Sequence, residues 1–135
     1  MINTLPEQAK RYALVVGVND YDDGRISDLG GANRDARALA EALQQHAGFP
    51  HQQIFLLTTD QQDRDRKPTR GNILNRLAAL VDAVPEDGLL LVSFAGHGIE
   101  REEKPFLLPC DAPYSQNVRL LEDTAVGVVR LKEYI

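Results

Sequence analysis

Hydrophobic residues along the chain fall into short continuous runs, with segments of helical spacing between them. The runs at residues 12–18 and 89–95 are almost entirely apolar and rich in Val and Leu, which is typical of strands buried on both faces. Residues 54–58 predict a similar, shorter strand. Residues 106–108, closed by Pro109, predict a short piece at the edge of the sheet.

Two segments between these runs repeat apolar residues at three- and four-residue spacing, which predicts amphipathic helices. The first covers residues 36–47 and is followed by Gly48, a residue favoured just beyond a helix C-terminus. The second covers residues 73–84, with Thr69 as its N-cap and Pro85 ending it. The order strand, helix, strand, helix, strand predicts an α/β fold, a parallel sheet with helices on both faces.

The working residues of such sheets gather where the strands end, at their carboxyl edge. Three segments follow these strand ends, at residues 19–31, 59–65 and 96–98. The charged stretch at residues 60–68 is expected to be a solvated surface loop, because runs of charge usually are. Candidate chemistry is therefore sought in all three segments.

Composition and charge predict that the chain forms one domain with an acidic surface. Its 135 residues, 43% of them hydrophobic, are enough for one core. The net charge of −5 disfavours nucleic acid or an anionic membrane as the main partner. No apolar run approaches the roughly 20 residues of a membrane-spanning helix. Residues 1–7 lack the features of a secretory signal, and the single cysteine, Cys110, fits a reducing cytoplasm.

The sequence Gly96-His97-Gly98, directly after the apolar run 89–95, is the strongest candidate for chemistry. Histidine titrates near neutral pH and suits the role of general base for a thiol or a hydroxyl. The glycines let a substrate approach closely and leave the Gly98 amide free to bind an oxyanion. On spacing alone, a histidine in a glycine-rich turn without chemistry fits equally well.

Four segments of the chain together resemble the N-terminal, larger-subunit portion of the caspase-like cysteine peptidases, especially bacterial metacaspase-type domains. They are RYALVVGVNDYDD, LGGANRDARALAEAL, LLLVSFAGHG and PFLLPCDA, in that order. The resemblance implies a caspase-like three-layer α/β sandwich around a mainly parallel sheet, with its C-terminal strands missing from this chain. It divides the chain into an N-terminal extension, residues 1–10, and a histidine-bearing peptidase portion, residues 11–135. It further implies that His97 is the histidine of a Cys-His dyad and that Gly98 supplies an oxyanion-hole amide.

The resemblance also implies a substrate preference. The family motif Gly-x-x-x-Asp-Ala matches residues 31–36, and its aspartate is Asp35. In metacaspases this carboxylate binds the Arg or Lys before the cleaved bond, which implies a protein or peptide substrate with a basic residue there. From the residues alone, Asp35 is better explained as a carboxylate in the first turn of a helix, where the helix dipole favours it.

The nucleophile is where the sequence departs from the family pattern. The family's catalytic cysteine lies on the strand after the histidine, in an Asp-x-Cys setting, and the 135 residues end at Ile135 before such a strand. Residues 128–135 are expected to begin the helix that precedes the cysteine-bearing strand. Cys110 stands where the family commonly has a small apolar residue, so we expect it to be a buried hydrophobe.

These residues alone are therefore expected to be inactive. We expect the nucleophilic cysteine beyond residue 135, on a later segment or on a separate C-terminal fragment of the same protein. The 135 residues are then either one part of a self-processed protease or a truncated product, and the sequence fits both.

No cofactor is expected from the residues themselves. Calcium enters only by analogy with the family, because the acidic residues at 99–104 and at Glu122 and Asp123 lack a calcium-binding spacing. The three histidines are too dispersed for a zinc site.

A second hypothesis for function is a non-catalytic binding or regulatory module that keeps the caspase-like fold. Two further classes are disfavoured. A phosphoacceptor domain needs an acidic residue after the third strand, which here ends in Gly-His-Gly, and no glycine-rich phosphate-binding motif follows any strand.

Overall fold

The computed structural model describes residues 7–135. Residues 1–6 lie outside this part, so the expected N-terminal extension is described only from Glu7, and the expectation of no secretory signal falls almost wholly outside it. In sequence order the elements are η1 (Glu7–Lys10), β1 (Arg11–Gly17), α1 (Ala32–His46), η2 (His51–Gln53), β2 (Ile54–Thr58), η3 (Arg64–Arg66), α2 (Arg70–Ala83), β3 (Leu89–Ala95), β4 (Gly98–Arg101), β5 (Lys104–Leu107), α3 (Val118–Thr124), β6 (Val126–Gly127) and α4 (Val128–Glu133).

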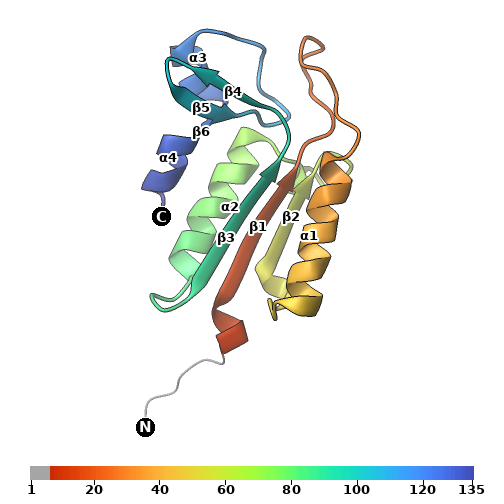
Figure 1. Cartoon of the computed structure of the whole chain (residues 1–135), viewed down its shortest axis with the longest axis vertical. Helices are drawn as coiled ribbons and strands as arrows, with labels where there is room; N and C mark the ends of the chain where they lie inside the picture. Colours follow the sequence, from red (N-terminus) through yellow and green to blue (C-terminus); the bar gives the residue numbers. More distant parts are fainter. Residues whose placement is uncertain (1–6) are drawn as a thin grey trace.

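The three longest predicted strands form one parallel sheet in the order β2-β1-β3 (Figure 1). The central strand β1 pairs on both sides, with Val15 opposite Leu56 of β2 and Ser93 of β3. Residues 13–16 of β1 are at most 1% exposed. The continuous apolar run is thus explained by burial on both faces, as predicted.

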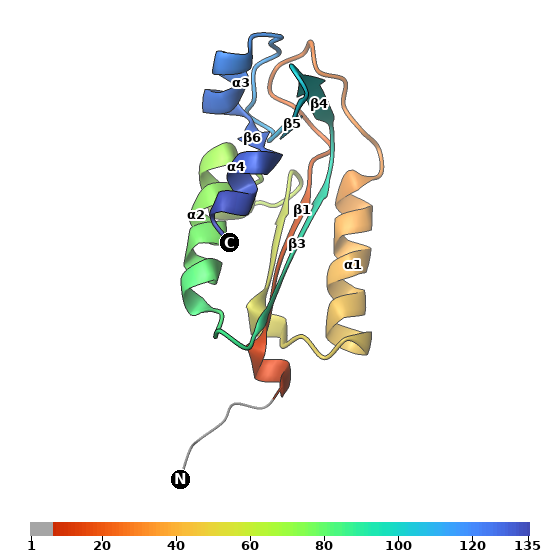
Figure 2. The ribbon, with the colours of Figure 1, turned by 60° about the vertical axis from the view of Figure 1, so that its left-hand side comes forward.

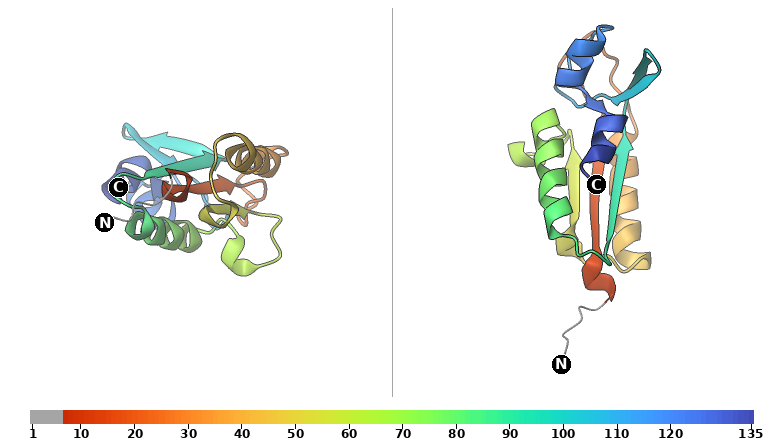
Figure 3. Two further views of the ribbon diagram at one scale, coloured as in Figure 1. Left: turned by 90° about the horizontal axis from the view of Figure 1, so that it is seen from below. Right: turned by 90° about the vertical axis from the view of Figure 1, so that its left-hand side faces the viewer.

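Helices α1 and α2 cover opposite faces of this sheet (Figures 2 and 3). Gly17 allows the close approach of α1, because a Cβ there would lie 2.7 Å from the carbonyl oxygen of Ala32. On the other face, α2 buries Ile73, Leu77 and Leu80. The predicted α/β architecture is confirmed.

The ends of both helices follow the sequence signals. The hydroxyl of Thr69 accepts a hydrogen bond from the backbone N–H of Asn72 at 3.1 Å, which makes Thr69 the N-cap of α2. Gly48, just past α1, has φ +70°, a left-handed conformation that favours glycine. The backbone then turns so that the amide of Phe49 bonds the carbonyl of Leu43.

A second sheet, antiparallel and in the order β4-β5-β6, lies beyond the carboxyl ends of β1 and β3 (Figure 1). The prediction of an edge strand at residues 106–108 is therefore wrong, since β5 is the middle strand. The sequence also predicts no strand at residues 99–104, where β4 and β5 form an antiparallel hairpin. Pro105 is tolerated since it lies at a position of β5 that donates no hydrogen bond to β4.

Two helices complete this end of the molecule. Helix α3 was not predicted, because seven residues carry too little periodicity. Helix α4 confirms that residues 128–135 begin a helix. Within residues 7–135, no helix has both the length and the apolar character needed to cross a membrane.

Candidate active site

His97 lies just after β3, at the carboxyl edge of the parallel sheet, and its side chain is partly buried. Its Nε2 atom lies 2.7 Å from the backbone carbonyl oxygen of Ser27. A carbonyl oxygen can only accept a hydrogen bond, so Nε2 carries the hydrogen. In the neutral imidazole, Nδ1 is then the atom with a free lone pair, ready to accept a proton.

The backbone around His97 is held from two sides. Its N–H donates to the hydroxyl of Tyr21 at 2.7 Å, and its carbonyl accepts from the N–H of Leu108 at 3.0 Å. The peptide bond to Gly98 is trans, so the Gly98 N–H points opposite to the His97 carbonyl. The Gly98 amide therefore points away from β5 and is available to a ligand.

A cavity of about 150 Å³ adjoins these two residues. His97 and Gly98 both line it, together with apolar side chains that include Ile26, Ile99 and Leu108. The surface beside the imidazole is thus concave and largely apolar, as binding sites for organic ligands usually are.

The segment at residues 19–31 reaches His97 because carboxylates fix its course. The backbone N–H of Tyr21 donates to Oδ1 of Asp28 at 3.0 Å. The Asp23 carboxylate accepts hydrogen bonds from Arg25 and from the backbone N–H of Tyr114. These contacts, those of the Arg25 side chain first, hold the pKa of Asp23 well below its usual range.

Asp35 lies in the first turn of α1 with an exposed side chain, and it does not line the cavity beside His97. Asn33 and Arg37 of the same helix contact Thr59 and Asp60 beside β2. Asp35 lies roughly 200° around the helix from Asn33, on the flank toward β3. The structure thus brings Asp35 to the same edge of the sheet as His97, with no direct contact between them.

Cys110 is buried, with 6% of its surface exposed, as expected. Burial, aided by the charges of Asp111 and Asp22, raises the pKa of its thiol to about 12. Its backbone joins two loops, since its N–H donates to Pro68 and its carbonyl accepts from Asp22. The thiol stays protonated at neutral pH and acts as a small apolar group.

Residues 10–127 match the family described as metacaspase, peptidase C14 domain. The chain belongs to the metacaspase family. Similar proteins include Metacaspase-1A of Aspergillus terreus, 38% identical over 90 residues, which are 66% of this chain and 22% of that protein. Metacaspase-1 of Debaryomyces hansenii is 39% identical over 90 residues, 66% of this chain and 20% of that protein. The aligned region spans about a fifth of the length of these relatives.

Membership confirms the caspase-like α/β fold and identifies the chain as part of a family of caspase-like cysteine proteases. The relatives named here are fungal, so the expected likeness to bacterial members stays a prediction. The roles of His97, Gly98 and Asp35 stay predictions.

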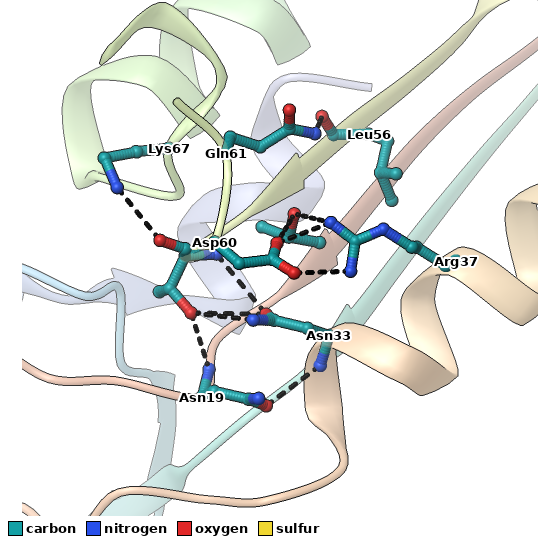
Figure 4. Close-up of polar contacts among 9 residues, drawn as sticks. Asn19, Asn33, Arg37, Leu56, Asp60, Gln61 and Lys67 are labelled. Atoms are coloured by element: carbon teal, nitrogen blue, oxygen red, sulfur yellow. Dashed lines mark hydrogen bonds and ion pairs between the residues drawn. The ribbon is translucent and has the colours of Figure 1, made fainter. Parts of the chain in front are cut away.

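The metacaspase chain also has a polar cluster that the sequence did not predict, where β1 and β2 end (Figure 4). Asn33, only 4% exposed, donates from Nδ2 to the Thr59 hydroxyl at 3.0 Å. Its backbone N–H donates to Oδ1 of Asn19 at 2.9 Å. The cluster ties the first turn of α1, which carries Asp35, to both strand ends. Its sequence signal was the placement of polar residues just past two strand ends, at Asn19 and at Thr59.

Arg37 and Asp60 extend this cluster as a two-pronged ion pair, with N–O distances of 2.6 and 2.5 Å (Figure 4). Arg37, helped by the hydroxyl of Thr58, lowers the pKa of Asp60 to about 2. Nearby, Lys67 donates to the carbonyl of Thr59 at 2.9 Å. The stretch 60–68 is therefore not just a solvated loop, because side chains at both of its ends bind the sheet and α1.

The part of this metacaspase that the structure describes has no set of side chains suited to bind calcium. No group of three or more His, Cys, Asp or Glu side chains among residues 7–135 is placed to hold a metal ion. Of the acidic residues near the β4–β5 hairpin, Glu122 pairs with Lys104 at 3.3 Å. The described side chains do not fit a calcium site.

Proposed function

We propose that these residues are the histidine-bearing part of a cysteine endopeptidase that cleaves peptide bonds after Arg or Lys. The observation that carries the proposal is that the His97 imidazole and the Gly98 amide lie side by side at one edge of the sheet. His97 has its Nε2 bound by the Ser27 carbonyl and its Nδ1 free, while the adjoining Gly98 amide points away from β5. A general base beside an oxyanion donor is the minimum that acyl transfer to a thiol requires.

The proposed chemistry starts with proton transfer. Nδ1 of His97 takes the proton of a cysteine thiol, and the sulfur attacks the carbonyl carbon of the substrate. The Gly98 N–H donates to the resulting oxyanion. The tetrahedral intermediate collapses as His97 returns the proton to the leaving amine, and water then hydrolyses the thioester by the same route. The Ser27 carbonyl accepts from Nε2 throughout and stabilises the imidazolium.

The nucleophilic cysteine is proposed to lie beyond residue 135, on a later segment or on a separate C-terminal fragment of the same protein. Cys110 does not suit the role, because its thiol is buried and its pKa is raised. Within the described residues, β3 pairs only with β1 and has a free edge. Its residues 90–95 are only partly buried. A further parallel strand on this edge would carry a cysteine at its carboxyl end next to His97.

The proposal has two consequences for the protein as a whole. The 135 residues alone are inactive, and where the cysteine lies on a separate fragment, self-processing of the complete protein separates the two parts. The single cysteine of these residues supports activity in a reducing cytoplasm.

The preference for basic residues rests on Asp35. Its carboxylate is exposed at the edge of the sheet that carries His97 and takes no part in the ion pairs formed within residues 7–135. A free carboxylate there supports binding of the cationic side chain before the cleaved bond, by a charge-assisted hydrogen bond.

The test is cleavage by the full-length protein of matched peptides with Arg, Lys, Asp or Ala before the scissile bond. Cleavage after Arg and Lys alone, absent in the His97→Ala variant, is the expected result. Cleavage that survives His97→Ala would contradict the proposal. No cleavage of any peptide would favour the alternative, a non-catalytic module with the same fold.

A further inference from the structure

The hydroxyl of Tyr21 takes the place of a backbone carbonyl at the end of the β1–β3 ladder. The last backbone bond of that ladder runs from the N–H of Val18 to the carbonyl of Ala95. Two residues later, the N–H of His97 donates to the Tyr21 hydroxyl at 2.7 Å. Tyr21 itself is 7% exposed, so its ring is fixed in the core.

Two further contacts fit this side chain to His97. The rings of Tyr21 and His97 have centroids 5.2 Å apart, with their planes at 47°. Gly96 leaves the space that the hydroxyl needs, because a Cβ at Gly96 would lie 3.0 Å from it. Tyr21 therefore contacts the imidazole of His97, the backbone N–H of His97, and Gly96.

We propose that Tyr21 is a positioning residue for His97 and, through the next peptide, for the Gly98 amide. The inference rests on the proposed function, since it gives Tyr21 a part in the same reaction. One segment, residues 19–31, then holds His97 at two points, with the Ser27 carbonyl on the ring and the Tyr21 hydroxyl on the backbone. Together with the Leu108 N–H on the His97 carbonyl, these contacts fix the orientation of the ring relative to the oxyanion amide.

The uncharged Tyr21 hydroxyl is the group that positions His97. Burial is the main cause that raises the pKa of Tyr21 above its usual value, so the hydroxyl keeps its proton at neutral pH. Replacing Tyr21 by Phe thus removes one acceptor without removing a charge. The N–H of His97 loses its partner while the ring contact stays.

The test compares Tyr21→Phe with Tyr12→Phe in the full-length protein. Tyr12 pairs with Leu90 near the start of β3, at the opposite end of the sheet from His97. We expect Tyr21→Phe to lower kcat about tenfold with KM nearly unchanged, because a small misplacement of reacting groups acts on the transition state. We expect hydrogen exchange at the His97 amide to accelerate at least about tenfold. Tyr12→Phe should change neither.

Equal kcat values for the two variants, or unchanged exchange at His97 in Tyr21→Phe, would overturn the inference. A uniform loss of folded protein, seen as equal exchange changes throughout the sheet, would also overturn it and leave Tyr21 a purely structural role. If the unmodified protein cleaves no peptide, the proposed function fails and the catalytic role of Tyr21 with it. Faster exchange at His97 would then report only a local contact, so the two failures are distinguishable.

Discussion

The carbonyl oxygen of Ser27 lies 2.7 Å from Nε2 of His97, and this contact decides which imidazole nitrogen is free to act as a base. The partner is a backbone atom rather than a carboxylate. The orientation of His97 therefore depends on the course of the backbone at residues 19–31, not on the side chain at position 27.

This contact predicts opposite results for two substitutions. His97→Ala should lower kcat/KM at least about 100-fold, because it removes the proton acceptor and donor. Ser27→Ala should change kcat/KM less than about twofold, because the acceptor atom remains. Steady-state kinetics of both variants against an Arg peptide check the prediction. Equal losses in the two variants would show that the serine side chain, not the carbonyl, is the group that matters.

Asp35→Asn should reduce kcat/KM for Arg and Lys peptides at least about tenfold, since it removes the charge that binds the basic side chain and keeps its shape. Glu41→Gln is the matched control, because Glu41 is an exposed carboxylate on the same helix. Peptide kinetics measure the effect. Similar kcat/KM values for both variants would remove Asp35 from the specificity site.

Cys110→Ala should leave peptidase activity within about twofold of the unmodified protein and lower stability by about 1 kcal/mol, as small buried truncations do. Alkylation of the native thiol should be slow at pH 8, because its pKa is raised to about 12. Timed iodoacetamide labelling followed by mass analysis measures the alkylation rate of Cys110 in the native and in the denatured protein. Rapid native labelling of Cys110 would contradict the buried, inert thiol.

The Arg37–Asp60 pair predicts a loss of stability in acid. The pKa of Asp60 is about 2 in the folded protein and 3.8 without its partners. A lowered pKa stabilises the fold above about pH 4, and this contribution is lost as the pH falls toward 2. Both side chains are more than a third exposed, so the contribution is at most about 1 kcal/mol.

Urea unfolding between pH 7 and pH 2.5 measures this contribution. Asp60→Asn should be less stable than the unmodified protein at pH 7, and the difference should shrink in acid. Asp65→Asn is the control, since Asp65 lies in the same stretch and its side chain forms none of the described ion pairs. A constant difference across the pH range would show that the ion pair contributes no pH dependence.

Gly17→Ala should destabilise the fold by about 1–3 kcal/mol, the usual cost of overpacking a core. Its Cβ would lie 2.9 Å from that of Ala36, so α1 would have to move outward. Gly24→Ala is the control, because its Cβ would meet nothing within 4 Å. Thermal unfolding compares the two, and equal melting temperatures would contradict the close packing of α1 on β1.

The sequence was sufficient for the parts of the fold that rest on local pattern. Strands β1, β2 and β3 are continuous apolar runs because both faces of the sheet are covered, and Thr69 caps α2 as its residue type predicts. The Gly-His-Gly triplet marked the edge of the sheet where the candidate site lies. Each of these features needs only neighbouring residues to be recognised.

The missed features depend on residues far apart or on turns without their usual residues. The β4–β5 hairpin turns at Glu102 and Glu103, which have φ of 52° and 64° where Asn or Gly is normally found. The contact of Tyr21 with His97 joins residues 76 positions apart, so no local spacing reports it. Tertiary packing sets these features, and a single sequence does not encode them as a pattern.

We propose that His97 activates a cysteine outside these 135 residues. The most direct test treats the full-length, natively expressed protein with a peptide chloromethyl ketone that ends in Arg, whose chloride a reactive cysteine sulfur displaces. Peptide mass mapping then locates the adduct. We predict one adduct, on a cysteine beyond residue 135, that is lost in the His97→Ala variant. An adduct on Cys110, or one that forms equally well without His97, would contradict the claim.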